Sequence, residues 1–203
     1  MPYRRTPAVQ ARLDAQRADV LAAAVGLLRE QGYGGCSMSA VAARAGVATG
    51  TMYRHFPSKA DLVAELFRTV VRREVAAVTE AAAAHPDPVA AVVAVVETFA
   101  SRALKAPRLA YALLAEPVAP AVDRERLLFR TAFRDVFAER IAAGVALGVL
   151  PPQDARLTAS ALVGAGAEAL VGPLSQGDAG PATLPALTAF VTRALGVPDA
   201  GHP

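Results

Sequence analysis

The apolar and polar residues of this chain alternate with the period of helices. Apolar positions recur three and four residues apart, as in Leu62, Leu66 and Val70, and no segment sustains the period-two alternation of a strand. Proline and short polar stretches interrupt this pattern at residues 85–88, 106–107, 116–120, 151–152 and 173–181. The pattern therefore predicts an all-α protein with helices over about residues 58–83, 89–105, 108–115, 122–147, 155–170 and 183–195.

Two shorter helices are predicted before these, over residues 38–45 and 49–55, with Gly46 between them. Glycine suits a tight turn because it accepts positive φ at little steric cost, and Ser37 stands where an N-cap is needed. Met52 points inward in the second short helix. The residues left pointing outward carry hydroxyl, guanidinium and imidazole groups, the chemistry that meets phosphates and base edges: Thr49, Thr51, Tyr53, Arg54 and His55.

The next helix begins with a predicted cap and an unfavourable charge. Ser58 and Asp61 have the spacing of a capping box, although Asp replaces the usual Glu or Gln. Lys59 opposes the helix dipole at this position unless an anion lies nearby. A DNA phosphate would remove that objection.

Positive charge is concentrated around these elements. Residues 1–60 contain eight Lys or Arg against three Asp or Glu, whereas the rest of the chain contains 13 against 15. This asymmetry favours a polyanionic partner for the first part of the chain only. Arg4, Arg5 and Arg12 are expected to precede the first regular helix, either as an arm that reaches DNA or as a solubilising disordered tail.

From Val20 to Leu62 the sequence resembles the TetR-type transcriptional regulators. Besides the segment around Gly46, the resemblance rests on Val20-Leu21, Ala23-Ala24, Leu27-Leu28, Gly32-Tyr33 and Ser37, which are similar to the family's first helix and its exit. It implies a three-helix helix-turn-helix DNA-binding domain, residues 1–57, followed by a helical ligand-binding and dimerisation domain, residues 58–203.

The resemblance also implies which residues contact DNA. Thr49, Thr51 and His55 are expected to approach bases, and Arg54 to contact either bases or phosphates. The full set is Ser37, Ser39, Thr49, Gly50, Thr51, Tyr53, Arg54, His55 and Lys59, in which Ser37, Tyr53 and Lys59 are expected to hold phosphates. Ser39 and Ala48 are shorter than many residues at such positions, so the operator sequence is not predicted.

Three of these residues also have a purely structural interpretation. Tyr53 is compatible with a core position, His55 with a solvated helix end and Lys59 with an ordinary surface charge. The spacing of the whole set favours DNA binding over these separate interpretations.

The segment 157–177 is rich in Ala and Gly and carries one charge, Glu168. Small residues let helices approach closely, so residues 155–173 and 183–195 are expected to form a homodimer interface, where the resemblance also places it. The alternative is a membrane span, which the central Glu168 and the frequent Gly and Pro disfavour. Residues 164–169 also match a dinucleotide fingerprint, but no strand precedes them.

Candidate residues for a small-molecule site are more dispersed. The aromatic candidates are Phe99, Tyr111, Phe129, Phe133 and Phe137, and Arg102, Glu97 and Glu116 are candidate polar anchors; ordinary core and surface positions are the alternative for each of them. His55, His85 and His202 are scattered and Cys36 has no evident base, so neither an enzyme nor a bound metal or cofactor is expected.

Together these patterns predict a homodimeric DNA-binding regulator, most simply a repressor released from a palindromic operator by a small molecule. The alternative is a helical small-molecule-binding module without a role at DNA. The chain has no basic-then-apolar signal peptide, and its single cysteine suits a reducing compartment, so a cytoplasmic location is expected.

Overall fold

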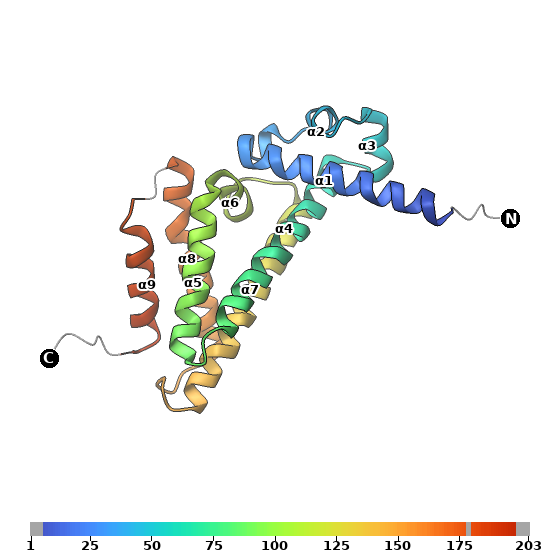
Figure 1. Cartoon of the computed structure of the whole chain (residues 1–203). Helices are drawn as coiled ribbons and strands as arrows, with labels where there is room; N and C mark the ends of the chain where they lie inside the picture. Colours follow the sequence, from blue (N-terminus) through green and yellow to red (C-terminus); the bar gives the residue numbers. More distant parts are fainter. Residues whose placement is uncertain (1–5, 178–179, 198–203) are drawn as a thin grey trace.

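The computed structural model describes residues 6–177 and 180–197, and every regular element in these ranges is an α-helix (Figure 1). This confirms the all-α prediction. The helices are α1 (Pro7–Gly35), α2 (Met38–Ala45), α3 (Thr49–His55), α4 (Lys59–Ala83), α5 (Pro88–Lys105), α6 (Pro107–Leu114), α7 (Pro120–Ala146), α8 (Ala155–Gln176) and α9 (Thr183–Ala194).

The turn between α2 and α3 forms as its local chemistry predicts. Ser37 Oγ accepts a hydrogen bond from Ala40 N at 3.1 Å, which caps α2 at its start, and Gly46 ends the helix with a φ of 66°. Val41 and Met52 are fully buried where the two helices meet. The predicted bounds of both short helices are confirmed.

Substitution of Gly46 should measure the contribution of this turn. A Cβ at position 46 would meet no atom within 4 Å, so only the left-handed backbone conformation opposes a side chain there. We expect Gly46→Ala to lower the free energy of unfolding by about 1 kcal/mol in urea titrations, and Gly46→Asn to lower it less, because asparagine tolerates this conformation better. Equal stability of Gly46→Ala and the wild-type protein would contradict this account.

Two hydrophobic cores share one long helix. Leu62, Leu66 and Phe67 of α4 are fully buried in the core below α2 and α3, whereas Val78 and Ala82, nearer the end of α4, belong to the core of the C-terminal bundle. The first core also receives side chains from α6 and α7, namely Leu109, Ala112, Leu113 and Val122. The expected boundary between residues 57 and 58 thus falls at the cap of a helix that packs into both cores.

The C-terminal bundle is built from α4, α5, α7 and α8, with α9 at the edge of the molecule away from α2 and α3 (Figure 1). Three aromatic side chains meet at its centre: the ring centroids of Phe99 and Phe133 are 5.1 Å apart, and those of Phe129 and Phe133 are 4.5 Å apart, both edge-to-face.

The structure corrects two predictions about helix ends. α8 continues through Pro173 to Gln176, beyond the expected break, because Leu170 and Leu174 are buried on either side and their packing offsets the lost backbone hydrogen bond. Arg12 lies within α1, which begins at Pro7 with Thr6 as its cap, and therefore does not belong to an arm. Arg4 and Arg5 lie outside the described residues.

Candidate nucleic-acid interface

The outward face of α3 is accessible at one end of the molecule (Figure 1). Thr49, Gly50 and Arg54 are exposed, and Tyr53 has 54% of its surface accessible, whereas Thr51 and His55 are half-buried. Tyr53 is therefore not a core residue. A large aromatic ring with a hydroxyl group on an exposed helix face is suited to a contact with another macromolecule.

α3 is fixed to α1 by contacts at its C-terminal end. The imidazole Nε2 of His55 lies 3.0 Å from Gln16 Oε1, and the Arg17 guanidinium lies 4.9 Å from the ring centroid of Phe56, directly after α3. His55 is thus engaged within the protein and is not simply a solvated helix end. These contacts hold α3 in a defined orientation.

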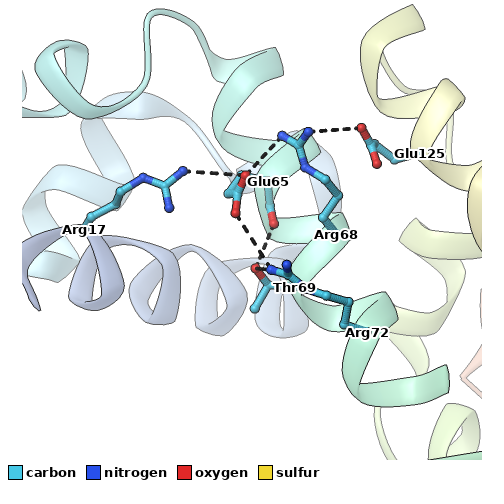
Figure 2. A network of polar contacts seen from close by, with 6 residues as sticks. All are labelled: Arg17, Glu65, Arg68, Thr69, Arg72 and Glu125. Atoms are coloured by element: carbon cyan, nitrogen blue, oxygen red, sulfur yellow. Dashed lines mark hydrogen bonds and ion pairs between the residues drawn. The ribbon is translucent and has the colours of Figure 1, made fainter. Parts of the chain in front are cut away.

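Glu65 of α4 forms ion pairs with three arginines (Figure 2). Its carboxylate lies 3.5 Å from Arg17 of α1, 3.1 Å from Arg68 and 3.9 Å from Arg72. Arg68 also reaches Glu125 of α7 at 3.4 Å. The network joins α1, α4 and α7, so it links the support of α3 to the C-terminal bundle.

The two predicted serines lie together at the start of α2. Ser37 Oγ lies 3.1 Å from Ser39 Oγ, and Ser39 is exposed. Their hydroxyls are near a helix N-terminus, a favourable place for a phosphate oxygen.

Lys59 has partners inside the protein. Its ammonium donates to the carbonyl oxygen of Tyr33 at 2.8 Å and lies 4.0 Å from the centroid of the Tyr33 ring. It is therefore not an ordinary surface charge. An ammonium has three donors, so two remain for the predicted phosphate contact.

Cys36 is a buried packing residue. It has no exposed surface, and burial raises the pKa of its thiol, with the charge of Lys59 acting weakly in the opposite direction. The thiol is therefore protonated at neutral pH. Across residues 6–177 and 180–197, no group of three or more His, Cys, Asp or Glu side chains comes together as a metal site.

The C-terminal end of α1 is held by side chains from the second half of the chain. Glu116 Oε2 accepts a hydrogen bond from Tyr33 N at 2.9 Å, and Arg108 of α6 donates to the carbonyl oxygen of Glu30. The Glu30 carboxylate also receives two hydrogen bonds from Arg44 of α2, which lower the pKa of Glu30. The contacts of Arg108 and Glu116 join the helix-turn-helix unit to α6 and to the segment that follows it, and no sequence pattern marks them.

The predicted ligand residues are only partly brought together. Phe99, Arg102 and Phe129 line a cavity of about 410 Å³, and Phe133 and Phe137 line a smaller void of about 30 Å³ beside it. The structure does not bring Tyr111, Glu97 or Glu116 into either: Tyr111 packs against the C-terminal core, Glu97 is exposed and Glu116 binds Tyr33.

The surface formed by α8 and α9 is unusually apolar. Leu157 is 68% exposed and Phe190 40% exposed, and a depression of about 350 Å³ between the two helices is lined by residues that include Ala165, Ala169 and Phe190. α8 is long and apolar enough to cross a membrane, but it also packs against α6 and α7. Residues 164–169 lie within this helix, so the dinucleotide fingerprint has no structural counterpart there.

Comparisons with known proteins agree with the helix-turn-helix geometry. Residues 20–66 match the family profile described as "Bacterial regulatory proteins, tetR family". An uncharacterized HTH-type transcriptional regulator of Mycobacterium tuberculosis is 48% identical over 54 residues, which make up 27% of this chain and 25% of that protein. The match thus spans about a quarter of the length of that relative.

Solved structures extend the similarity to the whole fold. A TetR transcription regulator from Haloarcula marismortui superposes with a TM-score of 0.78 at 20% identity, covering 90% of this chain and 97% of that one. The transcriptional regulator FadR from Bacillus subtilis, solved in complex with stearoyl-CoA, gives a TM-score of 0.76 at 20% identity and covers 90% and 99% of the two chains. Both have the helical architecture described above.

Proposed function

We propose that this chain, which belongs to the TetR family of bacterial transcriptional regulators, is a homodimeric repressor that a small molecule releases from a palindromic operator. The observation that carries the proposal is the exposed face of α3. Thr49, Tyr53 and Arg54 are exposed there, and the contacts of His55 and Phe56 with α1 hold the helix in place. A short helix held rigidly at the end of a molecule can enter a DNA major groove.

We propose roles for residues on α3 and for Ser37, Ser39 and Lys59, which lie outside it. Thr49 and Thr51 are proposed to read bases, with Tyr53, Ser37 and Lys59 on phosphates and Arg54 on either. Ser39, Gly50 and His55 complete the proposed surface. Because phosphate contacts are independent of sequence, Lys59 is expected to contribute affinity and Thr49 to contribute selectivity.

Dimerisation is proposed through α8 and α9. Only 28% of the most apolar 18-residue window of α8 is buried within one chain, and Leu157 and Phe190 extend the apolar surface across both helices. Two copies would cover this surface and place two α3 helices about one DNA turn apart, roughly 34–36 Å. Such a protein would act in the cytoplasm, where its DNA is.

Release by a small molecule is supported by the cavity between the two halves of the chain. A ligand that binds better to one spacing of the two α3 helices would shift the population toward that spacing. The FadR structure contains stearoyl-CoA, which supports a small-molecule effector for this chain as well.

Operator binding should separate the proposed roles. By fluorescence anisotropy with an inverted repeat from upstream of the chain's own gene, we expect Lys59→Ala to weaken binding to all sequences and to reduce the salt slope by about one. Thr49→Ala should change which sequence binds best, by roughly tenfold between the preferred and other bases, because a side-chain contact to a base edge is worth about 1–3 kcal/mol. In sedimentation experiments, the protein without DNA should have a molecular mass twice the chain mass of 20.9 kDa.

Glu139→Gln, exposed on α7 and outside both α3 and the proposed α8–α9 interface, serves as the control and should leave DNA affinity unchanged. If Lys59→Ala and Thr49→Ala remain folded dimers with wild-type affinity for every DNA, the DNA-contact assignment is wrong. If the wild-type protein binds a small molecule but shows no salt-dependent affinity for DNA, the alternative of a ligand-binding module without a role at DNA is favoured.

A further inference from the structure

A cavity lies where the helix-turn-helix unit meets the C-terminal bundle. It has a volume of about 410 Å³ and is walled by α4, α5, α6 and α7, with Arg29 reaching it from α1. Since one water needs only about 10–15 Å³ of such space, the cavity has room for a small organic ligand.

The lining of the cavity carries an excess of positive charge. Three exposed cations line it, Arg29, Arg102 and Lys105, against a single acid, Glu74. Glu74 is already occupied, since Arg102 donates to its two carboxylate oxygens at 2.5 and 2.8 Å. Within the described part of the chain neither Arg29 nor Lys105 takes part in a salt bridge, so their two charges are not neutralised by a neighbouring acid.

The rest of the lining is largely apolar. Val70, Leu109, Leu114 and Phe129 are buried residues of its wall. Phe99, Leu114 and Phe129 also line the smaller void beside it, whose other walls are largely apolar and include Phe133 and Leu187. The cavity therefore combines a group of cationic side chains with apolar walls, and Phe99, Leu114 and Phe129 connect those walls to the apolar void.

From this combination of unneutralised cations and apolar walls we infer that the cavity binds an amphipathic organic anion, with its carboxylate or similar head group at Arg29 and Lys105 and its apolar tail against Phe99, Leu114 and Phe129. A charge-assisted hydrogen bond to a guanidinium or ammonium stabilises the head group, and burial of the tail supplies the hydrophobic contribution. Neutral and cationic molecules with the same tail cannot form this charge-assisted hydrogen bond and should bind more weakly.

The position of Arg29 gives this ligand a route to DNA. The next residue, Glu30, binds Arg44 of α2 through its carboxylate and Arg108 of α6 through its carbonyl oxygen. A head group that draws Arg29 toward the cavity therefore acts on the end of α1 where both halves of the chain hold it. This regulatory meaning rests on the proposed function, whereas the binding itself does not.

Isothermal titration of the full-length protein without DNA tests the ligand class directly. The probes are decanoate, decan-1-ol and decylamine, which share one tail and differ in head-group charge. We expect decanoate to bind at least tenfold more tightly than the alcohol, and the amine more weakly than both. Tighter binding of the alcohol or the amine, or no binding of decanoate, would overturn the inference.

The double variant Arg29→Gln/Lys105→Gln tests where the head group lies. It should abolish the preference for decanoate over decan-1-ol while leaving binding of the alcohol within about twofold, because the apolar wall is intact. Arg124→Gln, an exposed arginine of α7 that does not line the cavity, should retain the full preference. A retained preference in the double variant, with an unchanged urea midpoint, would place the anion elsewhere.

The result does not depend on operator binding. A protein that prefers decanoate through Arg29 and Lys105 yet binds no DNA would support the ligand class and contradict the proposed repressor function. A protein that binds its operator but shows no preference for decanoate would support the repressor function and overturn the ligand class.

Discussion

Arg126→Ala is expected to lower the free energy of unfolding by about 3 kcal/mol, because the side chain satisfies three backbone carbonyls at once. Its guanidinium donates to Leu113 O at 2.8 Å, to Ala112 O at 3.1 Å and to Glu116 O at 2.7 Å. The first two belong to the last turn of α6, where carbonyl groups lack partners within the helix. Only 12% of the Arg126 side chain is exposed, so water replaces these bonds poorly.

Urea unfolding followed by circular dichroism would measure the loss. Arg126→Lys should recover part of it, since an ammonium can reach one or two of the carbonyls but lacks the planar fork of a guanidinium. Arg124→Ala removes an exposed arginine from the same helix and should change stability by less than about 0.5 kcal/mol. A loss below 1 kcal/mol for Arg126→Ala would show that solvent satisfies the end of α6.

Gly32→Ala should destabilise the protein by a similar amount, about 3 kcal/mol. Gly32 interrupts α1 with φ 69° and ψ −170°, a backbone conformation that is essentially restricted to glycine. A Cβ there would also lie 3.2 Å from Glu116 Oε2, the atom that accepts the hydrogen bond from Tyr33 N. The substitution thus strains the backbone and crowds the contact that joins α1 to the C-terminal half.

Gly34→Ala is the matched control for thermal and urea unfolding. It lies two residues further along α1, its φ is not positive, and a Cβ there meets no atom within 4 Å. It should be neutral or slightly stabilising, because alanine loses less conformational entropy than glycine on folding. If Gly32→Ala is as stable as Gly34→Ala, then Gly32 does not require its observed conformation.

The parts of the fold that depend on local chemistry could be predicted from the sequence. Ser37 caps the start of α2, and Gly46 ends it. Ser58 Oγ accepts a hydrogen bond from Asp61 N at 3.1 Å and donates one to Asp61 Oδ2 at 2.7 Å, which caps α4. Each signal lies within three residues of its partner. For this reason α2 and α3 have the bounds that the sequence predicts.

Contacts between distant segments could not be predicted in the same way. Lys59, Arg108 and Arg126 donate to backbone carbonyls, and every residue carries a carbonyl, so the sequence does not mark the partner. Glu116 shows the consequence: its charge suggested a ligand anchor, but it accepts from a backbone N–H 83 residues earlier in the chain. The same limit applies to Pro173, whose tolerance depends on buried neighbours along the helix.

The shared core around α4 bears on whether a DNA-binding domain of this kind can be exchanged between proteins. The family profile ends at residue 66, but the core beneath α2 and α3 is completed by Leu109, Leu113 and Val122. A DNA-binding head grafted from a relative at residue 57 would meet a foreign set of these side chains from α6 and α7. A transplanted DNA-binding domain should therefore be accompanied by the α6 residues that it packs against. Without them, the new sequence specificity would come with a poorly packed core and lower stability.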